Sequence, residues 1–335
     1  MTGLAWQIFL FAAGIGLLVG GAWLLISGGS RVAAVLRVPP VIVGLTVVAF
    51  GTSAPELFVS VVGALKGNTG LVLGNVIGSN VANLGLILAA AALLGPVIVE
   101  RGLSRRELPL LLGATILFTI LAWDGRLGRL DAGLLVLGFF AFMWWTLMNR
   151  DRGAVVADVP EKLPQIDPGH RIRETTRGTG MTILGVGGLA AGGHLIVTAA
   201  LSLAVRMGVS ETLIGLTLVA VGTSLPELAT TIVAALRDED DLALGNIVGS
   251  NLFNILAVAG PVGLFWNLDA KGNQLPLTSF PLQPTPLQVQ MICMLALTIM
   301  VFSMIILGRG KIGRVRGLVL LLTYALIMFL WTTLN

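Results

Sequence analysis

The sequence predicts an all-α polytopic membrane protein, built from ten transmembrane helices as two inverted five-helix repeats. Composition is the first reason: 56% of the 335 residues are hydrophobic and only 11% are charged, whereas soluble domains carry about 25% charged residues. Apolar runs of about 20 residues, long enough to cross a bilayer, recur along most of the chain. Finally, two polar motifs inside those runs each occur twice.

The apolar runs define ten spans and one long polar interruption. The first five lie at roughly 4–27, 41–65, 70–95, 107–123 and 130–149, and the second five at 179–206, 211–236, 242–265, 286–307 and 315–334. We therefore expect a first repeat over 1–149, a linker over 150–178 rich in Arg, Asp, Glu and Pro, and a second repeat over 179–335.

The two halves are copies of each other. At one constant offset between the halves, Gly44–Leu57 overlays Gly215–Leu228 with 11 identities in 14, and Leu71–Asn83 overlays Leu242–Asn254 with 8 in 13. Because five spans is an odd number, the second copy enters the membrane from the opposite side. Inverted repeats of this kind are common in secondary transporters, which bind their substrate at mid-membrane between the repeats.

The basic residues predict the orientation. The loops after spans one, three, five, seven and nine hold 16 lysines and arginines, and the loops on the other side hold 5. Cytoplasmic loops carry the excess of Lys and Arg. We therefore expect the 150–178 linker in the cytoplasm and both termini outside.

The first repeated motif is "GTSAPEL", from Gly51 to Leu57, and its copy is "GTSLPEL", from Gly222 to Leu228. Its glycine and proline weaken the α-helical ladder, so we expect helices 2 and 7 to be broken. Broken backbone at membrane depth survives only inside protein or beside a water-filled cavity. The exposed carbonyls, two hydroxyls and a carboxylate suit hard cations such as Na⁺ and Ca²⁺.

The second motif is "GNVIGSNVAN", from Gly74 to Asn83, and its copy is "GNIVGSNLFN", from Gly245 to Asn254. Asn75, Ser79 and Asn83 are spaced four apart and form one polar stripe on a helix. We expect the glycines of the motif, Gly74 and Gly78 in the first copy, to permit close approach of a neighbouring helix. Inversion would bring the Glu56 and Glu227 segments together, so the motifs predict an oxygen-lined chamber with two carboxylates.

Other functions have little support in the sequence. There is no His/Cys ligand cluster, no phosphate-binding glycine loop in a βαβ context and no nucleophile elbow, so we expect neither an enzyme nor a bound cofactor. The net charge of +4 lies mostly in short loops beside the membrane and implies no nucleic acid. Cys293 is the only cysteine, which excludes an intrachain disulfide.

The paired motifs resemble the α-repeats of the calcium/cation antiporter superfamily, and most of all those of prokaryotic sodium/calcium exchangers. The resemblance covers nearly the whole chain and implies exchange of several Na⁺ for one Ca²⁺ at a shared central site by alternating access. It implies Glu56 and Glu227 as the central carboxylates and Thr52 and Thr223 as further Ca²⁺ ligands. The flanking Na⁺ sites and the middle position would be completed by Ala49, Ala220, Ser53, Ser79, Ser224, Ser250, Asn83 and Asn254.

Some relatives carry an acid where this chain has Asn83 or Asn254. With asparagine at both, two carboxylates remain, which leaves open H⁺/Ca²⁺ exchange and K⁺-dependent Na⁺/Ca²⁺ exchange; a cation channel lined by the same oxygens is a further alternative. The expected setting is multi-pass in a prokaryotic plasma membrane, with lipid and the transported ions as partners and no protein partner.

Overall fold

The computed structural model describes residues 3–36, 38–99, 105–148, 171–206, 220–269 and 287–333. These ranges are helical apart from turns and two short two-stranded ribbons. Within these ranges, seven helices are long and apolar enough to cross a membrane, or eight if the bent helix pair Pro40–Thr52 and Ala54–Leu65 counts as one span. Two shorter apolar helices lie at Glu107–Leu121 and Leu225–Leu236.

Two helices differ from their predicted boundaries. Helix α1 runs from Leu4 to Leu36, well beyond the predicted end near 27, and α10 begins at Arg171, inside the predicted linker. Gly28 packs against α10, and α1 continues past it. The polar start of α10 is held by contacts to the end of α1, since Arg31 pairs with Glu174 and Arg171 donates to the carbonyl of Val35 at 2.9 Å.

The chain forms two compact units, each made of segments from both halves of the sequence. Unit 1 contains Met1–Ser53 and Arg150–Asn246, and unit 2 contains Ala54–Asn149 and Ile247–Asn335. Of the three boundaries along the chain, two fall within repeated motifs, after Ser53 and after Asn246, and the third follows Asn149. Neither unit therefore corresponds to a sequence repeat, and each combines elements from both.

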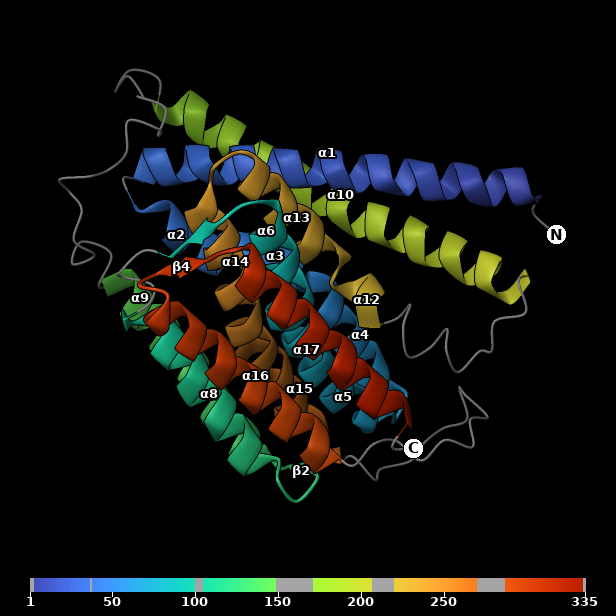
Figure 1. The fold of residues 1–335 in the computed structure, drawn as a ribbon, viewed down its shortest axis with the longest axis vertical. Coiled ribbons are helices and arrows are strands. Elements are labelled where there is room, and N and C mark those ends of the chain that lie inside the picture. Colours follow the sequence, from blue (N-terminus) through green and yellow to red (C-terminus); the bar gives the residue numbers. More distant parts are fainter. Residues whose placement is uncertain are drawn as a thin grey trace. The chain divides into compact units, whose positions relative to one another are not determined.

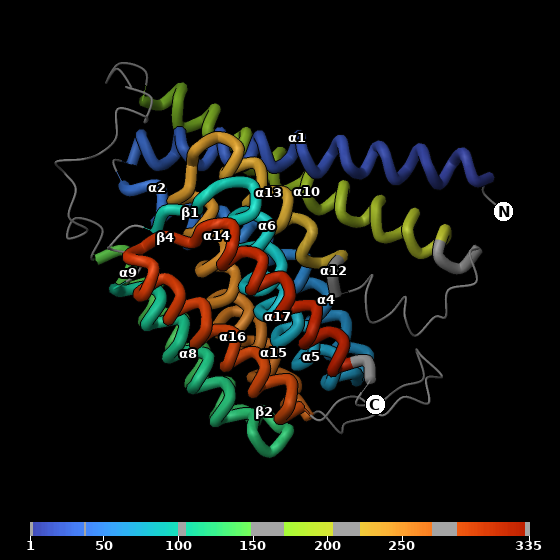
Figure 2. Tube along the Cα trace, in the orientation of Figure 1, coloured from blue at the N-terminus to red at the C-terminus, as the bar shows by residue number. Residues whose placement is uncertain are grey.

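Unit 1 is built around the two longest helices, which lie side by side in antiparallel directions (Figures 1 and 2). Regularly spaced glycines let them touch: Gly14 faces Gly192, Gly21 faces Gly185 and Gly28 faces Gly178. A Cβ atom at Gly21 would lie 2.7 Å from the backbone nitrogen of Leu189. The remaining elements of unit 1 are α2 (Pro40–Val43), the π-helical η1 (Gly44–Val48), α3 (Ala49–Thr52), α12 (Ala220–Thr223), α13 (Leu225–Leu236) and the first part of α14 (Asp240–Phe253).

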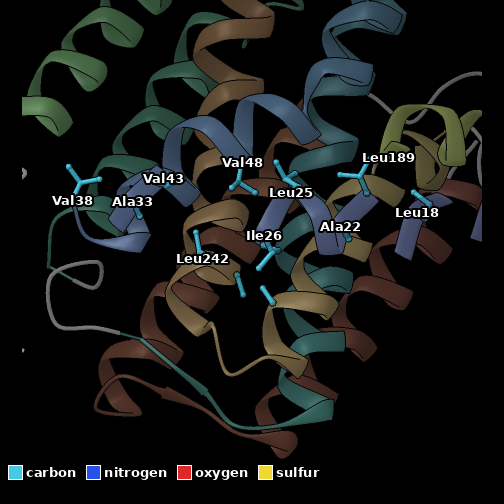
Figure 3. Packing of buried hydrophobic residues seen from close by; sticks show 12 residues of the cluster. Leu18, Ala22, Leu25, Ile26, Ala33, Val38, Val43, Val48, Leu189 and Leu242 are labelled. Carbon is cyan, nitrogen blue, oxygen red and sulfur yellow. The ribbon is translucent and has the colours of Figure 1, made fainter. Parts of the chain in front are cut away.

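The core of unit 1 joins the two halves of the sequence. Figure 3 shows Leu25 and Ile26 of α1 with Val48 of η1, Leu189 of α10 and Leu242 of α14. The loop after α13 is also fastened to α1: Arg237 donates to Ser27 at 2.6 Å and lies over the Trp23 ring, 5.7 Å from its centroid. Within unit 1, α3 packs against α10 and α13, so the part of the first motif that it carries lies against helices of the second half.

Unit 2 contains the other membrane-sized helices. Its elements are α4 (Ala54–Leu65), α5 (Thr69–Ala82), η2 (Asn83–Ile87), α6 (Leu88–Leu94), α8 (Glu107–Leu121), α9 (Arg129–Met148), the second part of α14, η5 (Asn254–Ala259), α15 (Gly260–Trp266), α16 (Leu287–Leu307) and α17 (Arg314–Thr333). Helix α4 packs on α5, α8 on α16, α9 on α15 and α17 on α6. The most apolar windows of the Thr69–Leu94 and Asp240–Trp266 spans are largely buried, and the second of these spans belongs to unit 2 from Ile247 onward.

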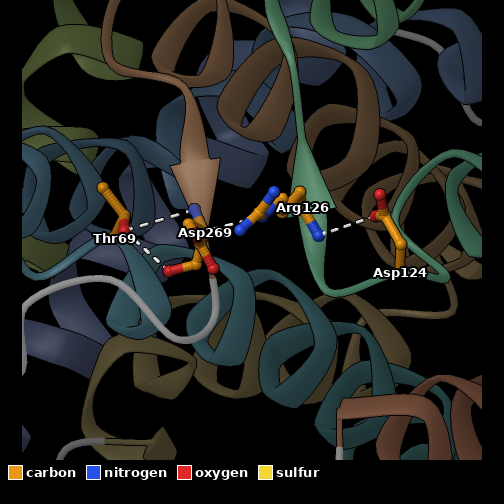
Figure 4. A network of polar contacts seen from close by, with 4 residues as sticks. All are labelled: Thr69, Asp124, Arg126 and Asp269. Atoms are coloured by element: carbon orange, nitrogen blue, oxygen red, sulfur yellow. Dashed lines mark hydrogen bonds and ion pairs between the residues drawn. The ribbon is translucent and has the colours of Figure 1, made fainter.

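Two antiparallel ribbons cross-connect the halves within unit 2. β1 (Val97–Ile98) pairs with β4 (Lys311–Ile312), and β2 (Arg126–Leu127) pairs with β3 (Leu268–Asp269). Each ribbon joins the loop after the third span of one half to the loop before the last span of the other. Figure 4 shows the second ribbon. The carboxylate of Asp269 forms an ion pair with Nε of Arg126 at 3.2 Å, and the hydroxyl of Thr69 donates a hydrogen bond to the backbone carbonyl of Asp269 at 2.8 Å.

Candidate functional site

Both copies of the first motif interrupt a helix at the serine. Helix α3 ends at Thr52 and α4 begins at Ala54, and in the copy α12 ends at Thr223 and α13 begins at Leu225. The intervening serines have nearly the same backbone angles, φ −83° and ψ 3° at Ser53 and φ −87° and ψ 5° at Ser224. The prolines that follow fall in the first turn of the next helix, where proline is tolerated. The predicted breaks are present in both copies.

Each break places a glutamate at a helix N-terminus. Glu56 lies in the first turn of α4 and Glu227 in the first turn of α13. Both side chains are buried, with 1% of each residue exposed. A helix N-terminus has backbone N–H groups without helical partners and favours negative charge. The local fold therefore stabilises a carboxylate at each position.

In unit 1, polar contacts connect the two copies of the motifs. The hydroxyl of Ser53, from the first copy, donates to Oε1 of Glu227, from the second, at 3.0 Å. The hydroxyl of Thr52 donates to Oδ1 of Asn246 at 3.0 Å. Asn246 in turn donates through Nδ2 to Oγ1 of Thr231 at 3.2 Å. All five residues are buried.

In unit 2, the matching asparagine makes a matching contact. Asn75 donates through Nδ2 to Oγ of Ser60 at 3.0 Å and to the carbonyl of Glu56 at 3.1 Å. In the overlay of the two halves, Asn75 corresponds to Asn246 and Ser60 corresponds to Thr231. In both copies, an asparagine of the second motif therefore holds the helix that carries the glutamate.

The twin asparagines at the end of the second motif each begin a π-helical turn. Asn83 opens η2 and Asn254 opens η5, and each residue is 1% exposed. Within the described ranges, neither the amide oxygen nor the amide nitrogen of either residue has a hydrogen-bond partner. π-Helical turns in α-helices occur frequently at functional sites. Helix η5 packs against both α4 and α5, so the second asparagine lies on an element that contacts both motifs of the first half.

The other expected site residues are placed on the same elements. Thr52, Thr223, Ser79, Ser224 and Ser250 are buried, as is Ala49; Ala220 is the first residue of α12. Unit 1 holds Ala49, Thr52, Ser53, Ala220, Thr223, Ser224 and Glu227, and unit 2 holds Glu56, Ser79, Asn83, Ser250 and Asn254. Among the described residues, the hydroxyls of Ser79 and Ser224 have no hydrogen-bond partner.

The close contact expected of the motif glycines is present in the second copy. In the first copy, no described atom lies within 4 Å of a Cβ built on Gly74 or Gly78, and the segment that matches Val41–Gly44, at 212–215, lies outside the described residues. In the second copy, a Cβ on Gly245 would lie 2.7 Å from the carbonyl oxygen of Val41 and 3.0 Å from the Cα of Gly44. Four-residue spacing places glycines on one face but does not determine which face a neighbour covers.

Ser60 and Thr231 were not expected in the site. Each lies four residues after the glutamate of its motif, on the same face of the helix, and each accepts a hydrogen bond from the motif asparagine. The signal that could have identified them is a hydroxyl residue at the same position in both copies, just beyond the region of highest identity.

The chemistry of these side chains fits a hard cation. They offer carboxylate, hydroxyl, amide and carbonyl oxygens, which are the ligands that Ca²⁺ and similar ions prefer. In the described part of the chain, no group of three or more His, Cys, Asp or Glu side chains gathers as a soft-metal or multi-carboxylate cluster would.

An apolar helical protein with duplicated broken helices and buried oxygen-rich motifs belongs to the class of membrane ion transporters. The chain is a member of the sodium/calcium exchanger protein family, whose profile matches residues 6–148 and 177–333.

Similar proteins are known in archaea and bacteria. Sodium/calcium exchanger MaX1 of Methanosarcina acetivorans is 32% identical over 349 residues, covering 95% of this chain and 96% of that protein. Inner membrane protein YrbG of Escherichia coli is 36% identical over 258 residues, covering 75% and 77%. A structure of the sodium-calcium exchanger NCX_Mj, described in terms of extracellular ion exchange and induced binding-site occlusion, is 28% identical, covers 98% of each chain and has a TM-score of 0.79.

Proposed function

We propose that this protein exchanges Na⁺ for Ca²⁺ across a prokaryotic plasma membrane by alternating access. In this proposal the chain crosses the membrane ten times as two inverted repeats, 1–149 and 179–335. The 150–178 linker lies in the cytoplasm and both termini lie outside. Membership of the exchanger family supports Ca²⁺ and a counter-cation as substrates, and the similarity to MaX1 and NCX_Mj supports Na⁺ as that cation.

The proposal rests on one observation: in the described structure, the amide groups of Asn83 and Asn254 are buried and make no hydrogen bonds. A buried polar group without a hydrogen bond costs about 1–3 kcal/mol, and few such groups occur in native proteins. Among the described residues, four such atoms occur at matched positions of the two copies, on residues that are 1% exposed. Because the same amide recurs in both copies of a repeated motif, we assign these four atoms to the ion path, where an ion, or water around an ion, would satisfy them.

Charge balance supports a shared role for the two glutamates. One Ca²⁺ is neutralised by two carboxylates, and neither "GTSAPEL" nor "GTSLPEL" contains a basic residue. We propose that Glu56 and Glu227 together bind one Ca²⁺, and that they bind Na⁺ when Ca²⁺ has left. Thr52 and Thr223 add hydroxyl oxygens to the Ca²⁺ site. The remaining ligands in this proposal are Ser53, Ser79, Ser224, Ser250, Asn83 and Asn254, with the carbonyls of Ala49 and Ala220.

The matched local structure of the two copies supports the inverted repeat. The helix breaks at Ser53 and Ser224, the π-helical turns at Asn83 and Asn254, and the two ribbons each occur as a pair related by the sequence duplication. Alternating access needs two equivalent half-pathways, and paired elements of this kind would supply them.

A flux assay tests the proposal directly. The purified protein is placed in vesicles loaded with Ca²⁺, and Ca²⁺ release is followed after imposing a gradient of Na⁺, of K⁺ or of H⁺. We expect release with the Na⁺ gradient alone. Release driven only by H⁺ would assign the protein as a H⁺/Ca²⁺ exchanger, and a joint requirement for Na⁺ and K⁺ would assign K⁺-dependent exchange. Rapid Ca²⁺ release without any counter-ion would indicate a channel and contradict antiport.

A further inference from the structure

We propose that Asn246, anchored by Thr231, sets the direction of the Thr52 hydroxyl so that its lone pairs, not its hydrogen, face the transported cation. Asn246 and Thr231 are then positioning residues that act on Ca²⁺ affinity through Thr52 without touching the ion. The inference rests on the proposed function, because it takes Thr52 as a Ca²⁺ ligand.

The contacts form a chain across three helices of unit 1. Thr52 at the end of α3 donates to Oδ1 of Asn246 on α14 at 3.0 Å, and Asn246 donates to Oγ1 of Thr231 on α13 at 3.2 Å. All three residues are 0% exposed. At this burial, water does not compete for the hydrogen bonds, so the order of donors and acceptors along the chain is set by the side chains themselves.

Which group donates and which accepts matters, because a hydroxyl presents a hydrogen in one direction and lone pairs in others. It carries one hydrogen and two lone pairs, whereas the two ends of an asparagine amide are an acceptor and a donor. Thr231 accepts from the NH₂ end, so the oxygen of Asn246 faces Thr52. The Thr52 hydrogen is thereby directed at Asn246, at 3.0 Å, in preference to the carbonyl oxygen of Ala49, which lies farther away at 3.3 Å. Both lone pairs of the hydroxyl can then face a cation.

The first repeat contains the anchoring contact of this arrangement, between the asparagine and the hydroxyl. Asn75 donates to the hydroxyl of Ser60 at 3.0 Å, and these two residues occupy the positions that correspond to Asn246 and Thr231. The contact therefore occurs once in each unit, between a motif asparagine and a hydroxyl that lies four residues after a glutamate. A chance contact would not recur at matched positions on two separately packed units.

A neighbouring threonine shows that burial alone does not create this contact. Thr230 is also 0% exposed, but among the described residues its hydroxyl has no hydrogen-bond partner. The matching position of the first repeat is Val59, so a valine at this point of the motif is compatible with the fold. Thr230 is therefore a matched control: it has the same chemistry and burial as Thr231, one residue away.

The test compares Thr231→Val, Thr231→Ser and Thr230→Val with the parent in two measurements. One is the Ca²⁺ concentration for half-maximal Na⁺-driven exchange, and the other is the Ca²⁺-induced rise in thermal midpoint of the purified protein. Thr231→Val removes the acceptor and lets the amide turn its NH₂ toward Thr52, so we expect half-saturation to rise roughly five- to tenfold, the equivalent of one hydrogen bond. Thr231→Ser, which matches Ser60, and Thr230→Val should stay within about twofold of the parent.

A double variant identifies Thr52 as the residue through which Thr231 acts. If the effect passes through the Thr52 hydroxyl, Thr231→Val should have little further effect on Ca²⁺ affinity in a Thr52→Val background. Additive effects, or a Thr231→Val protein that matches Thr230→Val in Ca²⁺ affinity, would overturn the inference while the proposed function stands. A parent that neither binds nor exchanges Ca²⁺ would overturn both.

Discussion

At the scale of single residues, Glu56 and Glu227 occur where an apolar protein can best carry an acid. Each lies in the first turn of a helix, directly after a break, and is buried to 1% exposure. An acid at mid-membrane costs several kcal/mol unless it is paired, and the helix N-terminus offsets only part of this. In the proposed function, the remainder of the cost is offset when a cation binds, which would couple the charge of the glutamates to transport.

The glutamates give the first prediction. Glu56→Gln and Glu227→Gln should each lower Ca²⁺ exchange by about a hundredfold, because an amide lacks the charge that offsets a divalent ion and charge-assisted contacts contribute about 1.5–3 kcal/mol. Glu239→Gln is the control, since it removes a charge from a loop where Glu239 binds Ser30 and Arg237. Exchange in vesicles is the measurement, normalised to protein abundance. Near-normal exchange in either motif variant would refute the site.

The two motif serines give a second prediction, because their hydroxyls have different surroundings. Ser53 donates to Glu227 at 3.0 Å, whereas the hydroxyl of Ser224 has no hydrogen-bond partner in the described ranges. Ser53→Ala should therefore destabilise the ion-free protein by about 1 kcal/mol, and Ser224→Ala should leave it unchanged while raising the Na⁺ needed for half-maximal exchange. Thermal unfolding without Na⁺ or Ca²⁺ is the measurement. Equal losses of stability would contradict this difference.

At the scale of elements, the paired glycines of α1 and α10 determine how closely these helices pack. A Cβ on Gly21 would meet the Leu189 nitrogen at 2.7 Å, whereas in the described part of the chain nothing lies within 4 Å of one on Gly20. We predict that Gly21→Ala destabilises the protein by about 1–3 kcal/mol through overpacking. Gly20→Ala should be neutral or slightly stabilising, since alanine favours helix. Thermal unfolding of both variants decides, and similar midpoints would mean that the contact is easily relaxed.

The helical elements differ in how far the sequence predicts them. Hydropathy locates the spans well: α9 runs from Arg129 to Met148 and α16 from Leu287 to Leu307, close to the predicted 130–149 and 286–307. It does not predict the π-helical turns, because one additional residue in a turn barely changes an apolar pattern. It also misses the two-residue ribbons, which depend on pairing between loops far apart in the chain.

At the scale of the whole molecule, the duplication accounts for much of the site but not for its hydrogen bonds. The repeated motifs identify both helix breaks and both glutamates. They do not predict that the Ser53 hydroxyl contacts Glu227, or that Asn246 bridges Thr52 and Thr231. Those contacts depend on which helix faces meet, and that is decided by the packing of side chains within each unit.

The orientation in the membrane gives the last prediction. Basic residues favour the cytoplasmic side, and the 16-to-5 distribution of Lys and Arg predicts the 150–178 linker there and both termini outside. We expect a cysteine introduced at position 165, with Cys293 replaced, to resist a membrane-impermeant thiol reagent in intact cells and to react once the membrane is opened. A cysteine at Lys66, an exposed residue at the end of α4 on the predicted outer side, should react in intact cells. The opposite pattern would reverse the orientation of every span, and labelling of both positions from outside would contradict the odd number of spans between them.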